Sequence, residues 1–488
     1  MKTAVKRVAL TLVIISTFLV VLMALRVRRL PELEIWHTAV QEGDFTVRDV
    51  GAGFDLRDYM RQEQELFAEL ESGVEGYISS SPTLAISRFD PGGFNNPLGF
   101  PRNWNRTFEL FPEEIRGGAL LLHGLSDSPY SLRKVGEILV EQGYYVLGLR
   151  LPGHGTIPSG LLRVRWEDWM AATQLAMAGV RERVGGQKPI LMAGYSNGGT
   201  LAVRYALDAI QDESLIQANQ LILFSPAIGI SSLAKLAGLH RLLSFIPYFE
   251  RLRWLDILPE YDPYKYNSFT KNAATQSYRV TTGLQKEIDR FHRSGRLESL
   301  PPILTFVSLV DATVLSEAIV DRLYSRLDDP DSELVVFDVN RMAMMKPFYR
   351  TAPLDLLDRM EEIEDLPYRL TVLSNDDAES RRVAEWSRPA RSLATSFRDL
   401  ELEWPQGVFS LSHVAVPFPP DDPIYGRASS STGYGLPIGA LEPRGERHLL
   451  LVSADHFFRL RHNPFFSYME ERLVDLVAPE EASMEEVP

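Results

Sequence analysis

A serine within a short glycine-rich segment carries the strongest chemical signal in the sequence. Residues 194–199 read Gly-Tyr-Ser-Asn-Gly-Gly, directly after an apolar run at 189–193 and directly before a stretch with helical periodicity. A G-x-S-x-G pentapeptide between a strand and a helix is typical of a turn that exposes a serine nucleophile. Small residues at Gly194 and Gly198 let the strand and the helix approach closely. The pattern therefore predicts Ser196 as a nucleophile in acyl transfer.

A glycine-rich connector of another α/β protein, such as a phosphate-binding loop, is the alternative interpretation of this segment. Such loops carry a G-x-x-x-x-G-K-[ST] pattern or G-x-G-x-x-G spacing. Residues 194–199 have neither the lysine nor that glycine spacing. The strand, turn and helix setting of Tyr195 and Ser196 therefore favours the nucleophile.

Acyl transfer creates an oxyanion, which two preorganised backbone N–H groups must face. In this arrangement the residue after the nucleophile, Asn197, supplies one, and the loop after an earlier strand supplies the other. Residues 121–129 read Leu-Leu-His-Gly-Leu-Ser-Asp-Ser-Pro and begin in an apolar run. We therefore predict Leu125 as the second donor. His123 and Gly124 belong to the same loop, and we interpret His123 as structural because it precedes the nucleophile.

Short apolar runs alternate with helical stretches from Gly118 onward, which is typical of an α/β protein with a mostly parallel sheet. The predicted strands span 119–122, 145–149, 189–193, 221–224, 303–307 and 333–337. The predicted helices span 131–142, 166–184, 199–209 and 316–327. Such a sheet predicts right-handed crossovers and a site at the carboxyl ends of its strands.

Four segments resemble the α/β-hydrolase group of monoacylglycerol lipases, lysophospholipases, carboxylesterases and serine aminopeptidases. They are His-Gly at 123–124, Leu-Pro-Gly-His-Gly at 151–155, Trp-Glu-Asp-Trp at 166–169 and the Ser196 turn, in this order. The resemblance covers about 118–314. It implies an α/β-hydrolase fold with flanking helices, a lid after the sixth strand, no metal, and a triad in the order Ser, acid, His. The His154 side chain could line the pocket or pack within its loop.

The resemblance places the triad acid in the loop after the seventh strand. Residues 308–314 read Ser-Leu-Val-Asp-Ala-Thr-Val and fit the family's pattern of an aspartate a few residues before a valine. A buried carboxylate at Asp311 would orient the imidazole and stabilise imidazolium. A capping or surface aspartate is the other interpretation, and Asp338 and Asp376, which also follow apolar runs, are the substitutes.

Chain order restricts the base to the histidines that follow Asp311, namely His413, His448, His456 and His462. His413 lies in a small-residue loop that resembles the family's Ser/Gly-His-Val loop, so we predict it as the base. His456, at the start of a probable helix, is the alternative. The separation between Asp311 and His413 exceeds that of the family and requires the intervening chain to loop out and return.

An uncharged apolar run at 8–25 stands between two groups of cations, which are Lys2, Lys6 and Arg7 before it and Arg26, Arg28 and Arg29 after it. A helix of about 18 residues covers most of a roughly 30 Å hydrocarbon layer. A cleavable signal peptide is the competing interpretation, but its apolar core is shorter and precedes a small-residue site. We therefore expect residues 1–29 to be an N-terminal transmembrane anchor, with the large domain extracytoplasmic.

The expected organisation beyond the anchor is a lead-in segment at 30–115, a hydrolase domain at 116–478 and an acidic tail at 479–488. The lead-in includes an amphipathic helical pattern at 54–71. Two stretches interrupt the α/β alternation of the hydrolase domain. One is an apolar and aromatic stretch at about 227–300 that carries no clear strand and is predicted to be a helical lid. The other is a second insertion at about 341–400, where the run 369–373 could add a strand.

Composition excludes several function classes. Lys and Arg number 51 against 65 Asp and Glu, and the net charge of −14 argues against nucleic-acid binding. The absence of cysteine excludes a thiol nucleophile and a Cys-ligated zinc site. No metal-binding spacing such as H-E-x-x-H occurs.

The predicted function is therefore that of a serine hydrolase that cleaves acyl or lipid-like carboxylic esters. Ser196, activated by His413 and Asp311, would form an acyl-enzyme that water resolves, and no cofactor is required. A serine aminopeptidase or amidase of the same fold is the first alternative. A noncatalytic, membrane-tethered binding protein on a degenerate hydrolase fold is the second.

Overall fold

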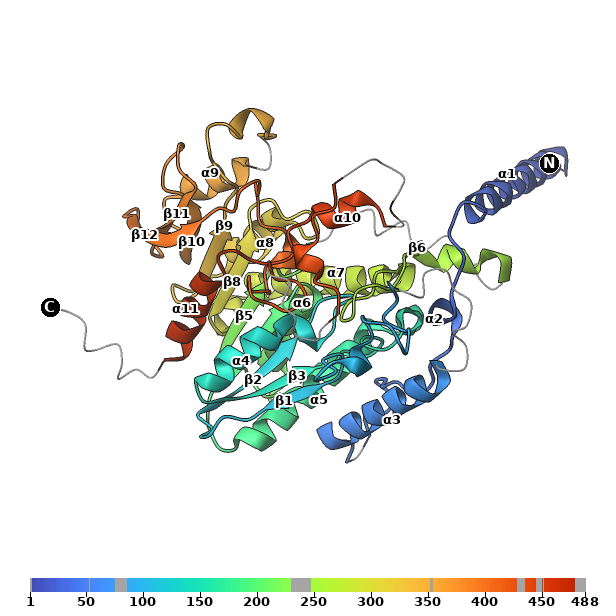
Figure 1. Ribbon diagram of the computed structural model, residues 1–488, viewed down its shortest axis with the longest axis horizontal. Helices are drawn as coiled ribbons and strands as arrows, with labels where there is room; N and C mark the ends of the chain where they lie inside the picture. The colour runs from blue at the N-terminus through green and yellow to red at the C-terminus, as the bar shows by residue number, and fades with distance from the viewer. Residues whose placement is uncertain are drawn as a thin grey trace.

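A ten-stranded sheet forms the centre of the molecule (Figure 1). The computed structural model describes residues 2–51, 53–74, 86–229, 247–351, 354–427, 435–444, 450 and 452–478. The strands in spatial order are β1 (Phe108–Leu110), β3 (Tyr144–Leu149), β2 (Gly117–Leu122), β4 (Ile190–Tyr195), β5 (Gln220–Phe224), β8 (Ile303–Ser308), β9 (Glu333–Phe337), β10 (Arg369–Asn375), β11 (Arg382–Arg388) and β12 (Ser396–Glu403).

The central strands pair in parallel from β3 through β10, whereas β1, β11 and β12 pair antiparallel to their neighbours. The predicted mostly parallel sheet is therefore confirmed, and each predicted strand overlaps with an observed one. Alternate side chains explain why these runs are continuously apolar. In β2, Leu120 and Leu122 enter one apolar core while Ala119 and Leu121 enter the other. Both faces of the central sheet are covered.

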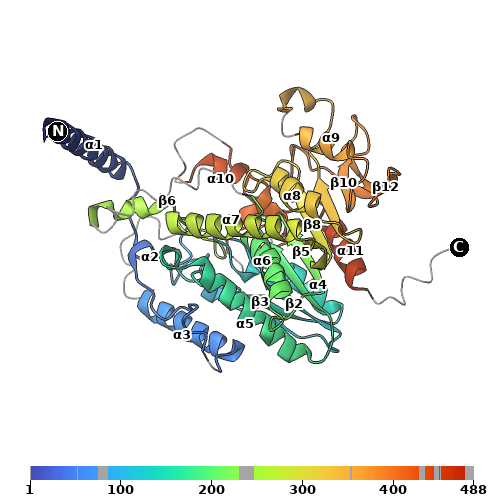
Figure 2. The same ribbon diagram turned by 180° about the vertical axis from the view of Figure 1, so that it is seen from behind.

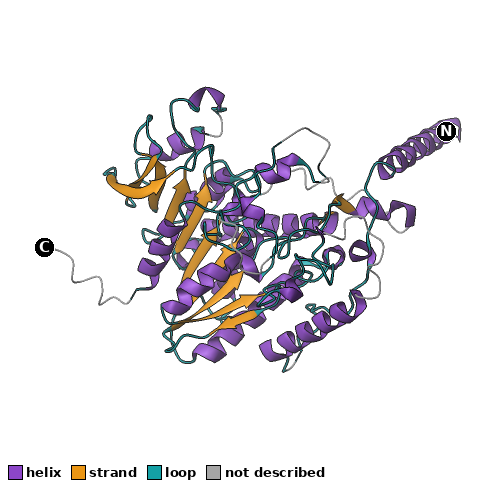
Figure 3. Ribbon diagram, viewed as in Figure 1, coloured by secondary structure: helices purple, strands orange, loops and turns teal. Residues whose placement is uncertain are grey.

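Helices cover the two faces of the sheet (Figures 2 and 3). The core on one face includes side chains of α4 (Arg133–Glu141) and α11 (Phe466–Val477). The opposite core includes side chains of α5 (Trp166–Val184), α6 (Asn197–Gln211) and α7 (Lys271–Arg293). Each predicted helix overlaps with an observed one, the last of them with α8 (Ser316–Arg322).

Three strands come from the stretch expected as a second insertion. The predicted strand at 369–373 is confirmed as β10, which extends the parallel sheet beside β9. A short helix, α9 (Asp355–Glu361), precedes it. The strands β11 and β12 were not predicted because much of β12 is exposed and charged, so it lacks an apolar face. The chain therefore runs from the centre of the sheet to one edge, where it adds β10, β11 and β12, and then returns.

Part of the stretch expected as a lid, residues 230–246, lies outside the described residues, as does the acidic tail at 479–488. The described remainder of the lid stretch contains α7 and a small two-stranded sheet of β6 (Trp254–Asp256) and β7 (Phe269–Thr270). A helical pattern alone was expected there, and the short strands differ from it.

The N-terminal helix α1 (Lys2–Val27) contains the apolar run that was predicted as a membrane anchor. The C-terminal end of this helix packs against the segment that contains Arg251 and Leu252. Val27 is buried against Leu252, and just beyond the helix the Leu30 carbonyl accepts from the Arg251 guanidinium at 3.2 Å. Across the described residues, no helix combines the length and apolar character needed to cross a membrane. The predicted transmembrane anchor, and the extracytoplasmic location inferred from it, are therefore not supported.

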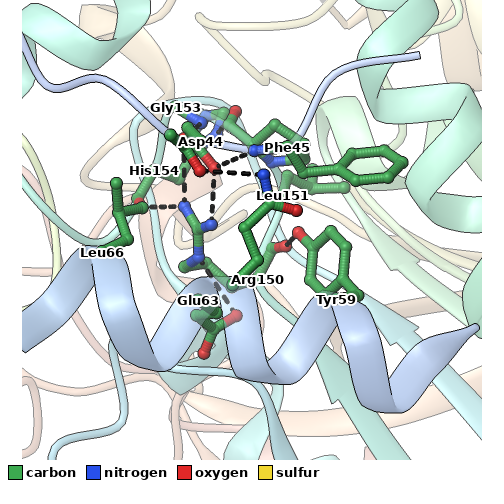
Figure 4. Close-up of polar contacts among 12 residues, drawn as sticks. Asp44, Phe45, Tyr59, Glu63, Leu66, Arg150, Leu151, Gly153 and His154 are labelled. Atoms are coloured by element: carbon green, nitrogen blue, oxygen red, sulfur yellow. Dashed lines mark hydrogen bonds and ion pairs between the residues drawn. The ribbon is translucent and has the colours of Figure 1, made fainter. Parts of the chain in front are cut away.

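The lead-in segment is joined to the sheet by a buried arginine (Figure 4). Arg150 follows β3 and is almost fully buried. Its guanidinium contacts Asp44 at 2.7 Å and Glu63 at 3.1 Å, and it also donates to the His154 carbonyl at 3.0 Å. Asp44 in turn accepts from the Gly153 backbone N–H at 2.7 Å. The predicted amphipathic helix is confirmed as α3 (Leu56–Val74), which supplies Glu63.

We predict that Arg150→Met strongly destabilises the protein, because it leaves the Asp44 and Glu63 carboxylates without the cation that neutralises them. Breaking a buried ion pair from one side typically costs about 3–5 kcal/mol. Urea unfolding at neutral pH measures this change in the free energy of unfolding. Arg359→Met is the matched control, since its ion pair with Glu317 is exposed and such pairs contribute little. Equal effects of the two substitutions would contradict the prediction.

Candidate active site

Ser196 occupies the tight turn between β4 and α6, as the glycine-rich motif predicts. Its backbone has φ 53° and ψ −114°, a conformation that a residue with a side chain rarely adopts. Two hydrogen bonds hold this turn, because the Ser196 N–H donates to the Phe224 carbonyl at 2.9 Å and its carbonyl accepts from the Ala227 N–H at 3.0 Å. The strain is thus maintained by the end of β5, which is the arrangement expected at a functional site.

The flanking glycines are required by close backbone contacts. A Cβ atom on Gly198 would overlap with the carbonyl of Leu122 at the end of β2. A Cβ atom on Gly194 would lie 2.6 Å from the Gly199 Cα atom. Only glycine therefore lets α6 begin this close to β2 and β4, and this places Ser196 at the carboxyl edge of the sheet.

Asp311 and His413 form a buried, directly hydrogen-bonded pair. The distance between His413 Nδ1 and Asp311 Oδ2 is 2.7 Å, and both side chains are almost fully buried. The other carboxylate oxygen accepts from the backbone N–H groups of Thr313 at 2.7 Å and Val314 at 3.0 Å. Both oxygens of Asp311 are therefore held, and the imidazole is oriented with Nε2 directed away from the carboxylate.

The surroundings of Asp311 favour its ionised form. Burial opposes ionisation, but the charge and the hydrogen bond of His413 outweigh it, together with the two backbone donors, and they hold the pKa of Asp311 below its usual value. An ionised carboxylate at this position can stabilise an imidazolium.

We predict that Asp311 makes a pH-dependent contribution to stability. Its folded pKa lies below the unfolded value of about 3.9. Ionised Asp311 therefore stabilises the fold above that value, and the contribution is lost as the pH falls through the folded pKa. Urea unfolding should show a larger difference in unfolding free energy between wild type and Asp311→Asn at pH 7 than at pH 3. A difference that does not vary with pH would contradict this.

His413 lies beside the residue that precedes the serine. The ring centroids of Tyr195 and His413 are 5.2 Å apart, and the Tyr195 hydroxyl donates to the His413 carbonyl at 3.3 Å. Within the described part of the chain, no hydrogen bond joins the Ser196 hydroxyl to the His413 ring. In ligand-free catalytic sites this contact is often long and tightens when substrate binds.

The two backbone groups predicted as oxyanion donors lie at the ends of neighbouring elements. Leu125 follows β2, and Asn197 is the first residue of α6. Neither backbone N–H has an acceptor among the described residues. The Asn197 side chain is fixed instead, because its Oδ1 accepts from the Ser277 hydroxyl at 3.0 Å. Free donors at a helix N-terminus suit a developing negative charge.

His123 has the structural role expected of it. Its Nε2 accepts from the Leu151 backbone N–H at 3.0 Å, which leaves Nδ1 to donate to the Gly124 carbonyl at 2.9 Å. Burial lowers the pKa of His123 well below its usual value, so the ring is neutral. It therefore joins the loop after β2 to the loop after β3.

His154 is fully buried, and its Nδ1 lies 3.0 Å from the Pro152 carbonyl. Its ring lies against those of His123, Trp169 and Tyr266. Burial lowers the pKa of His154 to about 4. These contacts support packing within the loop over exposure to a substrate.

The two aspartates considered as substitutes for the triad acid have other partners. Asp338 pairs with Arg341 at 2.6 Å, and Asp376 pairs with Arg382 at 2.8 Å. Of these three aspartates, Asp311 is the one that contacts a histidine.

Among the described residues, His456 and His462 do not pair with that carboxylate. His456 lies in α10 (Ala454–Phe458), where burial lowers its pKa. Burial also lowers the pKa of His462. His448 lies outside the described residues.

Two supporting contacts have no signal in the sequence. Lys265 forms an ion pair with Asp127 at 3.2 Å, and the Tyr266 N–H donates to the Ser126 carbonyl at 2.8 Å. These contacts hold the loop after β2 against a segment distant in the chain, which no local pattern relates to it. No group of three or more histidine or acidic side chains suited to a metal ion occurs in the part of the chain that the structure describes.

Comparison with known proteins agrees with this architecture. Residues 113–339 match the family model described as "Serine aminopeptidase, S33". A thermostable monoacylglycerol lipase from Bacillus sp. (strain H-257) is 35% identical over 89 residues, which are 18% of this chain and 34% of that protein. The chain thus spans about a third of the length of this curated relative. The predicted resemblance to this group of hydrolases is therefore confirmed over residues 113–339.

Solved structures of similar proteins include two lipases. The monoacylglycerol lipase of Paleococcus ferrophilus is 20% identical, with 52% of this chain and 99% of that chain covered and a TM-score of 0.36. A soluble variant of monoglyceride lipase from Saccharomyces cerevisiae, in complex with a substrate analog, is 14% identical, with 48% and 82% covered and a TM-score of 0.38.

Proposed function

We propose that this protein is a serine esterase that hydrolyses acyl or lipid-like carboxylic esters through Ser196, His413 and Asp311. The observation that carries the proposal is the buried Asp311–His413 pair, which lies beside the strained turn that bears the serine. Sequence motifs predicted these three residues, and they come from three loops at the carboxyl edge of one sheet.

The proposed reaction has two acyl-transfer steps. His413 takes the proton of the Ser196 hydroxyl as the oxygen attacks the ester carbonyl carbon, and Asp311 stabilises the imidazolium. The backbone N–H groups of Leu125 and Asn197 bind the oxyanion. His413 then returns its proton to the leaving alcohol, and an acyl-enzyme forms. Water, deprotonated by the same histidine, attacks the acyl-enzyme and releases the carboxylic acid and Ser196.

Relatives of this domain support an ester substrate. The curated relative is a monoacylglycerol lipase, and the ester of an apolar acyl chain is the corresponding substrate class for this chain. No metal or redox cofactor takes part in the proposed mechanism, because the serine, the imidazole and the backbone donors supply every step.

Amide hydrolysis is the second candidate, since the matching family model bears the description of a serine aminopeptidase. A substrate amine would require a free carboxylate near the serine. Two carboxylates that could be considered for this role have partners, because Asp127 pairs with Lys265 at 3.2 Å and Asp262 accepts from the Tyr425 hydroxyl at 2.6 Å. Glu260 is buried and accepts from backbone N–H groups. These contacts favour the ester.

We predict that a fluorophosphonate probe labels the wild-type protein and that Ser196→Ala abolishes labelling. The same substitution should lower kcat for p-nitrophenyl esters by about 10⁴-fold or more, since the nucleophile is lost. The exposed Ser214 serves as a control, and Ser214→Ala should label like wild type. Absence of labelling in the wild type would support a noncatalytic protein, and faster turnover of aminoacyl amides than of esters would support a peptidase.

We predict that the two histidines considered as the base behave differently. His413→Gln removes the proton acceptor, so kcat for p-nitrophenyl esters should fall by at least about 10³-fold. His456→Gln is the matched variant and should retain most of the activity, because His456 does not contact Asp311. A larger loss for His456→Gln than for His413→Gln would assign the base to His456.

A further inference from the structure

The segment 454–461, here called the C-terminal cap, contacts three segments around the candidate triad. The rings of Phe457 and Tyr261 stack with centroids 6.4 Å apart, and those of Phe458 and Phe409 lie 6.0 Å apart. Phe409 precedes His413 in the same loop. The cap is therefore positioned between the described part of the lid stretch and the loop that bears the proposed base.

Arg459 of the C-terminal cap reaches the loop of the proposed acid. Its Nη2 donates to the Thr313 hydroxyl at 3.0 Å, and the Thr313 backbone N–H donates to Asp311 at 2.7 Å. Two hydrogen bonds thus connect the guanidinium to the carboxylate of the triad. The side chain of Arg461 turns back and donates to the His456 carbonyl at 2.7 Å. Both arginines are partly exposed.

Neither arginine has a carboxylate partner within ion-pair distance among the described residues. Their charges nevertheless reach the serine turn. Burial raises the pKa of the Tyr195 hydroxyl, the charge of Asp127 adds to that rise, and the charges of Arg459 and Arg461 act against it. Both arginines therefore act electrostatically on the residue that precedes Ser196.

The carboxylates in the surroundings of these cations form no ion pair with them, although the charge of Arg461 acts on Asp262. Asp311 binds His413, and Asp127 pairs with Lys265. Asp262 accepts from Tyr425 and is buried. Asp256 and Asp455 act on His456 through their charges, as both arginines do. Two arginines that form no ion pair with a described carboxylate thus lie beside the loops of the candidate site.

We propose that Arg459 and Arg461 bind an anionic group, a carboxylate or a phosphate, on the ester substrate. This inference rests on the proposed esterase function. Guanidinium groups present fixed N–H donors that match carboxylate and phosphate oxygens. Arg459 is two hydrogen bonds from Asp311, which places the proposed anion site at the loop of the triad acid. Esters with a charged acyl or alcohol part are therefore preferred over neutral esters of equal length.

Two chromogenic esters of equal acyl length test this inference. They are p-nitrophenyl valerate, which is neutral, and mono-p-nitrophenyl glutarate, which carries a terminal carboxylate. The readout is the ratio of kcat/KM for the glutarate to kcat/KM for the valerate, which is independent of the amount of folded enzyme. Arg459→Met and Arg461→Met should each lower this ratio by about tenfold, the loss expected for a charge-assisted hydrogen bond. Arg459→Lys should restore part of it.

The control variant is Arg391→Met, which removes a surface arginine paired with Asp328, and its ratio should equal that of wild type. Added salt should lower the wild-type ratio toward that of the arginine variants, because screening weakens attraction between partly exposed charges. A structural role of Arg459 through Thr313 and Asp311 would reduce the rates for both esters alike and leave the ratio unchanged, which would overturn the inference.

A second pair of substrates separates a phosphate from a carboxylate. Monooleoylglycerol and its 3-phosphate, presented in the same detergent micelles, share one acyl chain and differ in the anionic group. A preference for the phosphate that Arg461→Met removes assigns the site to a phosphate, whereas a preference for the glutarate alone assigns it to a carboxylate.

Failure of the inference and failure of the proposed function give different results. Hydrolysis of the valerate with no preference for either anionic ester would refute the anion site and leave the esterase intact. No hydrolysis of any ester, together with no fluorophosphonate labelling, would refute both.

Discussion

A buried hydrogen bond of 2.7 Å joins Asp311 to His413 across 102 positions of the chain. The proposed chemistry depends on this contact, because an imidazole without a carboxylate partner would be neither oriented nor stabilised as imidazolium. Burial makes the pair sensitive to geometry, since a carboxylate removed from water is tolerated only where donors surround it. Asp311 meets this condition with the imidazole and two backbone N–H groups.

The parallel sheet explains why the pair and the serine converge. Ser196 follows β4 and Asp311 follows β8, and both strands end at the same edge of the sheet. His413 reaches that edge by another route, after the chain has added β10, β11 and β12 to the sheet. These strands continue the hydrogen-bond ladder, so the long excursion is a rigid extension of the sheet and not a loose loop. The loop that bears His413 therefore follows a strand, β12, that is held in the sheet by its pairing with β11.

The lead-in segment supports the same edge from outside the matched hydrolase region. Asp44 and Glu63 neutralise Arg150 and hold the backbone of the loop after β3. That loop contacts the loop after β2 through the His123 ring, and the latter carries Leu125. The C-terminal cap contacts the loop that bears Asp311 through Arg459 and Thr313. Residues before and after the hydrolase region therefore shape the surroundings of the serine.

Much of this arrangement was predictable from the sequence, and the reason is that its signals are local. The Ser196 turn requires glycine at neighbouring positions, and buried parallel strands require continuous apolar runs, so motif and fold class can be read from short segments. The loop with Leu125 was found in the same way. Strands with exposed charged faces, such as β12, lack that signal and were missed.

The choice between His413 and His456, and between Asp311 and Asp338, depended on contacts across long stretches of chain. Each candidate follows a plausible local pattern, and only the folded chain shows that Asp311 meets His413 while Asp338 meets Arg341. The same holds for Arg150 and Arg459, whose surroundings come from distant segments. Sequence alone thus determined the serine turn and the sheet, because backbone sterics and apolar periodicity act over a few residues. Tertiary structure decided the partners of the charged groups, because a buried charge is defined by whatever the fold brings within about 4 Å of it.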